Sequence, residues 1–102
     1  MRYRILLVDK NNSGLKYVYS INISGYPAFQ LWDKNLPESW IYTFYDEDSA
    51  IKKAKAAMTN NSTWFRRMAV DIDDLKKYSL MIFRYHNEGW YAESELTMEA
   101  KV

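Results

Sequence analysis

Only one segment of this chain has its apolar residues at helical spacing. Asp46 to Ser49 supply N-cap and first-turn side chains, and the apolar residues that follow share one face, opposite Lys52, Lys53 and Lys55. This pattern predicts one main helix over about residues 47–59. Because the other apolar runs are short and rich in aromatic and β-branched residues, they favour strands.

The expected strands are separated by polar turns. Gly14, Gly25 and Gly89 each follow a polar residue between apolar runs, where a turn needs a residue that tolerates positive φ. At residues 87–89 we expect a three-residue hairpin loop with Gly89 in the left-handed conformation. The expected strands cover residues 2–9, 15–24, 28–32, 40–45, 64–70, 78–85 and 90–95, with a short helical turn at 71–77. The sequence therefore predicts one α+β domain over residues 1–102, with a mostly antiparallel, curved sheet of six or seven strands and one main helix.

Such a sheet is too broad for one helix. A helix about 10 Å wide covers roughly two strands at a spacing of about 4.8 Å, whereas six strands span about 30 Å. Either the sheet curls on itself, or an aromatic face stays open for a partner or a second copy of the chain. The second alternative directs attention to the aromatic residues, which number four Trp, nine Tyr and four Phe.

The composition removes most common routes to catalysis and metal binding. The chain has no cysteine, and its single histidine, His86, lies beside a turn. We interpret the acidic group Asp71–Asp74 as a helix cap with first-turn acids, and not as a Mg²⁺ site. Ser79 and Ser94 lack the sequence context of a nucleophile elbow. We therefore expect no enzyme activity, no cofactor and no bound metal.

Charge and hydropathy indicate the setting. The net charge is +1, so no global field attracts the chain to nucleic acid or to anionic lipid. The apolar stretch near the start, Ile5–Val8, is too short for a signal peptide, and no run approaches the roughly 18 apolar residues of a membrane span. We expect a cytoplasmic protein that does not bind membranes.

The aromatic residues are the leading candidates for a binding surface. Tyr and Trp dominate the energetically important positions of protein interfaces, and several stand on or beside expected strands. The leading hypothesis is an interaction module that binds another protein, or itself, through an aromatic sheet face. The candidate contact residues are Tyr17, Tyr19, Trp32, Trp40, Tyr42, Trp90 and Tyr91.

The alternative hypothesis is binding of single-stranded nucleic acid. Cations beside aromatic rings suit phosphates and stacked bases, and the candidates are Lys52, Lys53, Lys55, Trp64, Arg66 and Arg67. A lysine face is also ordinary for a solvated helix, and neighbouring residues on a strand, such as Arg66 and Arg67, point to opposite faces. We therefore rank nucleic acid second.

The segment Trp40–Lys55, with the sequence WIYTFYDEDSAIKKAK, resembles a strand-to-helix passage of small accessory proteins of tailed bacteriophages. It covers about a sixth of the chain. The abundance of Asn, Lys, Ile and Tyr also suits an AT-rich genome, which many such phages have. The resemblance implies a short protein that binds and redirects a host factor, usually without catalysis, and it assigns no functional residue.

Overall fold

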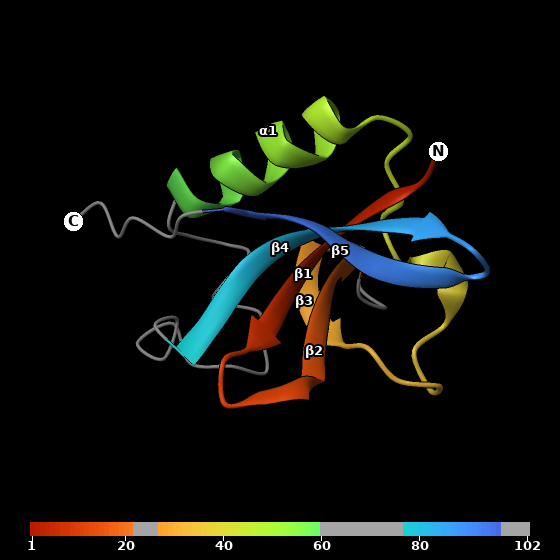
Figure 1. Ribbon diagram of the computed structural model, residues 1–102, viewed down its shortest axis with the longest axis vertical. Helices are drawn as coiled ribbons and strands as arrows, with labels where there is room; N and C mark the ends of the chain where they lie inside the picture. The colour runs from red at the N-terminus through yellow and green to blue at the C-terminus, as the bar shows by residue number, and fades with distance from the viewer. Residues whose placement is uncertain (22–26, 60–76, 97–102) are drawn as a thin grey trace.

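The computed structural model describes residues 1–21, 27–59 and 77–96 (Figure 1). These residues form an α+β fold with one antiparallel sheet, in the strand order β3-β2-β1-β4-β5. The predicted fold class is confirmed, but six or seven strands are too many, because the described residues contain five. The elements are β1 (Tyr3–Asp9), β2 (Asn12–Ile21), β3 (Pro27–Leu31), the 3₁₀ helix η1 (Glu38–Trp40), α1 (Glu47–Thr59), β4 (Tyr78–His86) and β5 (Gly89–Leu96).

The helix begins and ends where the sequence predicts. Asp46 is its N-cap: one carboxylate oxygen accepts the backbone N–H of Ser49 at 2.8 Å, and the other accepts the Ser49 hydroxyl at 2.7 Å. These two hydrogen bonds lower the pKa of the Asp46 carboxyl, the side-chain bond having the larger effect. The cap fixes the start of α1 at Glu47.

The predicted strand at residues 40–45 is wrong as a strand. Its residues 41–44 lie where β1 and β2 diverge, with Ile41 in a bridge to Ser20 of β2 and Phe44 in a bridge to Tyr3 of β1. Phe44 and Tyr3 exchange both backbone hydrogen bonds, at 2.7 and 2.8 Å. Because its two ends pair with different strands, the segment forms no continuous ladder. The predicted strand at 64–70 and all but the last residue of the predicted helical turn at 71–77 lie outside the described residues.

Two turns differ from the prediction. The β1–β2 turn is closed by Asp9, whose Oδ1 accepts the N–H groups of Asn11 and Asn12, so Gly14 lies within β2. The β4–β5 hairpin has a two-residue turn in which Asn87 and Glu88 have φ of 48° and 62°, as in a type I′ turn. Gly89 is therefore the first residue of β5 and not the left-handed residue of a longer loop.

One sheet face, here called the helix side, holds the larger apolar core. The helix packs mainly on β1 and β4, in agreement with the expectation that one helix covers about two strands (Figure 1). Tyr42 and Phe44, which belong to the segment 41–44 that bridges to both β1 and β2, pack onto the same core. Its buried members are Tyr3, Ile5, Leu7, Tyr19, Phe29, Ala50, Ala54, Tyr78, Leu80 and Ile82.

The other face, here called the loop side, is covered in part by residues 32–41. Trp32, Leu36 and Ile41 of this segment pack on alternate residues of the strands, because successive side chains of a strand point to opposite faces. The buried members from the strands are Leu6, Val8, Val18 and Phe83. Among the residues that the structure describes, no helix has the length and apolarity needed to cross a membrane.

Candidate protein-interaction site

Three of the predicted contact residues belong to the helix-side core. Tyr19 is 1% exposed, and the Tyr42 ring stacks on it at 4.7 Å between centroids. Burial, with a smaller contribution from Tyr42, raises the pKa of the Tyr19 hydroxyl. Tyr17 is half-buried and meets Tyr78 edge to face at 5.8 Å. These three rings are therefore part of the core, and the face that was predicted to stay open at Tyr17, Tyr19 and Tyr42 is largely packed.

Trp90 and Tyr91, which are neighbours on β5, point to opposite faces of the sheet. Tyr91 lies on the helix side, is 50% exposed, and packs beside His86 at 4.6 Å between centroids. Trp90 lies on the loop side and meets Trp32 at 6.1 Å in a T-shaped pair. Trp40 is half-buried at the end of η1. The structure thus brings together only Trp32 and Trp90 of the predicted set on the loop side.

Arg4, which is not among the predicted contact residues, lies against both tryptophans. The residue is 5% exposed, and its guanidinium carbon lies 4.1 Å from the Trp90 ring centroid and 5.6 Å from that of Trp32. Nη2 pairs with the Glu38 carboxylate at 2.7 Å, and Nε donates to the Thr43 hydroxyl at 3.3 Å. Nη1 is buried and has no hydrogen-bond partner within the described part of the chain.

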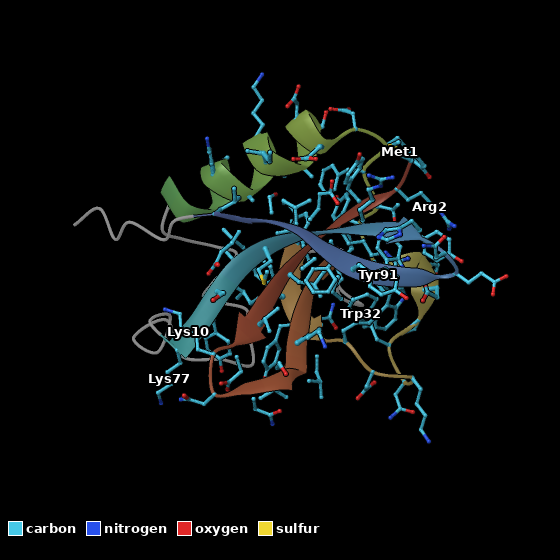
Figure 2. All side chains as sticks on the ribbon, viewed as in Figure 1. Met1, Arg2, Lys10, Trp32, Lys77 and Tyr91 are labelled. Carbon is cyan, nitrogen blue, oxygen red and sulfur yellow. The ribbon has the colours of Figure 1, made fainter. Side chains whose placement is uncertain are left out.

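Arg2 extends this arrangement toward solvent. Its guanidinium lies 4.1 Å from the centroid of the Tyr85 ring, and Tyr85 meets Trp90 at 5.3 Å. Arg2 itself is exposed, and its in-plane N–H groups are not used by the contact with the ring face. We call Arg2, Arg4, Trp32, Phe83, Tyr85 and Trp90 the Arg–aromatic cluster. In the view of Figure 2, Arg2 and Trp32 lie toward the β4–β5 hairpin, and Lys10 and Lys77 lie at the other end of the sheet.

Four parts of the chain build this cluster. Arg2 and Arg4 alternate at the start of β1, so both reach the loop side. Tyr85 and Trp90 are directly paired across the β4–β5 hairpin. Trp32 follows β3, where its N–H donates to the carbonyl of Lys16 at 2.9 Å. The sequence signal for Arg2 and Arg4 is their alternation with the apolar residues of β1. The prediction instead placed the cations that lie beside aromatic rings at residues 52–67.

The predicted nucleic-acid residues that the structure describes, all on α1, lie apart from the cluster. Lys52, Lys53 and Lys55 are exposed on α1, which packs on the helix side. Trp64, Arg66 and Arg67 lie outside the described residues. Among the described residues, the predicted cations of α1 are therefore not brought beside the aromatic rings of the loop side.

The residues weighed for catalysis and metal binding are also dispersed. Ser94 pairs with Ile82, four strand positions from His86, which corresponds to about 13 Å at the rise of a β-strand. Ser79 lies opposite Val8, on the loop side. No group of three His, Cys, Asp or Glu side chains within residues 1–21, 27–59 and 77–96 is arranged to hold a metal ion. Asp71–Asp74 lie outside these ranges.

Comparisons with protein-family models, curated proteins and solved structures find no match for this chain. The function is therefore inferred from the site.

Proposed function

We propose that this protein is a non-catalytic protein-interaction module whose binding surface is the Arg–aromatic cluster on the loop side. The observation that carries the proposal is the contact of two half-buried tryptophans, Trp32 and Trp90, with each other and with the buried Arg4. Trp, Tyr and Arg are the residue types most enriched at the energetic centres of protein interfaces. Of the seven predicted contact residues, the proposed surface keeps Trp32 and Trp90, and it combines them with two cations and two further rings.

The packing of the cluster favours binding. Arg4 supports one face of Trp90, Tyr85 contacts Trp90 edge to face, and Arg2 lies over Tyr85. Because these contacts restrict the rings before a partner arrives, little side-chain entropy is lost on association. The resemblance of residues 40–55 to phage accessory proteins supports a host protein as the partner, with a second copy of the chain as the alternative.

Binding of single-stranded nucleic acid is the second proposal, because cations and aromatic rings are adjacent in the cluster. Stacking of bases requires accessible ring faces. One face of Tyr85 is covered by Arg2 and one face of Trp90 by Arg4, so these rings present fewer free surfaces to bases. This arrangement favours a protein partner.

The test is capture of a tagged chain from bacterial lysate, with and without nuclease, using Trp90→Ala and Tyr91→Ala as matched variants. The two positions are adjacent on β5 but face opposite sides of the sheet. We expect a stoichiometric protein that survives nuclease, that is lost with Trp90→Ala, and that is retained with Tyr91→Ala. Thermal unfolding of both variants checks that they fold.

Two outcomes would contradict the proposal. Loss of the captured protein with Tyr91→Ala, and not with Trp90→Ala, would place the binding surface on the helix side. Loss of all bound material after nuclease, with binding that weakens steeply as salt rises, would support nucleic acid instead. A triple Lys52→Gln, Lys53→Gln, Lys55→Gln variant would then show whether α1 is the contact.

A further inference from the structure

Arg4 is only partly satisfied by the groups around it. A guanidinium has five N–H donors and pairs best with a carboxylate through two parallel hydrogen bonds. Here Nη2 meets a single oxygen of Glu38 at 2.7 Å and Nε meets Thr43 at 3.3 Å, whereas Nη1 is buried without a partner among the described residues. One donor group of a side chain that is 6% exposed therefore has no partner among the described residues.

The carboxylate that pairs with Arg4 comes from a weakly held position. Glu38 is the first residue of η1, a 3₁₀ helix of three residues without buried members. Its side chain is 74% exposed, although the guanidinium that it contacts is buried. An ion pair with one exposed partner contributes little to stability. Another carboxylate can therefore replace Glu38 without disturbing the sheet.

We propose that Arg4 is the recognition site for an acidic side chain of the protein partner, and that Glu38 fills this site in the free protein as an internal substitute. The inference rests on the proposed function of the Arg–aromatic cluster. The incoming carboxylate takes the place of the Glu38 carboxylate on Nη2 and also accepts a hydrogen bond from Nη1. Trp32 and Trp90 lie on the same guanidinium and limit its movement.

The surroundings favour an acidic protein segment. The group to which Arg4 already donates a hydrogen bond is a carboxylate, and the two oxygens of a carboxylate match the planar fork of a guanidinium. Arg2 lies on the same side of the sheet, exposed and held on Tyr85, so it offers a second cation to a neighbouring acidic residue. Both cations belong to β1 or the residue before it, which suits a short segment carrying two acids.

The first experiment tests the site without a partner. In a Glu38→Ala variant, acetate is titrated against chloride at equal ionic strength, and the melting temperature and the indole N–H signals of the tryptophans are followed. Glu93→Ala is the matched control, because Glu93 also pairs with an arginine, Arg84, at 3.6 Å. Glu38→Gln replaces Glu38→Ala if the alanine variant does not fold.

We expect acetate to raise the melting temperature of Glu38→Ala saturably and to shift one or two indole signals, with no such response in wild type or Glu93→Ala. Equal responses to acetate and chloride, or an equal response of Glu93→Ala, would refute a carboxylate site at Arg4. A stronger response to inorganic phosphate than to acetate would assign the site to a phosphate-bearing ligand and would also refute the proposal.

The second experiment uses the captured partner and separates this inference from the proposed function. Glu38→Gln should tighten partner binding by up to about fivefold, the factor that corresponds to loss of a competing exposed ion pair. Arg4→Met should weaken it. If the partner binds but neither variant changes its affinity, the proposed function stands and the role of Arg4 is wrong. If no partner is captured while acetate still rescues Glu38→Ala, the site stands and the proposed function fails.

Discussion

Replacing Arg4 by methionine should leave the free energy of unfolding within about 1.5 kcal/mol of wild type, despite the burial of this residue. The contact with Trp90 contributes about 2 kcal/mol, the Thr43 hydrogen bond about 1, and the pairing with exposed Glu38 about 1. Against these, desolvation of the guanidinium costs several kcal/mol, of which the unpaired Nη1 accounts for about 2. Methionine keeps much of the packing on the two indole rings, since its thioether also binds aromatic surfaces.

The companion variant Glu38→Ala should lose about 1–2 kcal/mol, because it leaves the buried guanidinium with the Thr43 hydroxyl as its one hydrogen-bond partner among the described residues. In the Arg4→Met background the same change should cost a few tenths of a kcal/mol at most, since its partner is absent. Urea unfolding followed by circular dichroism measures all four proteins, and an unchanged m-value shows that the unfolded states are comparable. A loss above about 3 kcal/mol for Arg4→Met would refute this reasoning and make Arg4 a structural residue.

Three further predictions concern the turn, the helix cap and the buried tyrosine. Glu88→Gly should raise stability in urea by about 0.5–1 kcal/mol, because Glu88 has a φ of 62°; no gain would mean that the turn is unstrained. Asp46→Ala should lower the melting temperature at pH 7, and the difference should disappear as pH falls through the lowered pKa of Asp46; a constant difference would contradict capping. Burial raises the pKa of Tyr19, so the free energy of unfolding should fall as pH rises above the ordinary tyrosine pKa of about 10. Urea midpoints measured below and above that pH should show a smaller fall for Tyr19→Phe than for wild type.

The helix and most strands followed from the sequence because their signals are local. Asp46 and Ser49 are three residues apart and make the cap by themselves. The prediction failed at the β-prone segment 40–45, because this segment makes two isolated bridges to different strands and no continuous ladder. Whether such a segment becomes a strand depends on where β1 and β2 separate, which residues 40–45 do not encode.

The loop length of the last hairpin also depended on more than one residue. The left-handed position of the loop was assigned to Gly89 in the prediction, but asparagine also tolerates positive φ, and Asn87 adopts it. Once Asn87 and Glu88 form the turn, Tyr85 faces Trp90 directly, and Gly89 leaves room for the ring of Tyr91. A three-residue loop would have changed this register and separated the two rings of the cluster.

The Arg–aromatic cluster could not be found from local patterns, because its members meet only after the sheet forms. Arg4 and Glu38 are 34 positions apart in sequence, and Trp90 comes from the last strand. The alternation of β1 predicts that Arg2 and Arg4 share a face, but nothing near them indicates two tryptophans above that face. The apolar neighbours Leu6 and Val8 point to the same side, where a buried cation is unexpected.

The burial of Arg4 among apolar residues is the physical argument for a function on the loop side. Within the described part of the chain, the buried members of the helix-side core are all aliphatic or aromatic side chains. On the loop side a methionine at position 4 would fill similar space without a desolvation cost. An arginine that is expected to add little to stability, that has one donor group without a partner among the described residues and that pairs with an exposed carboxylate supports the proposed recognition role. It also contacts both tryptophans of the proposed binding surface.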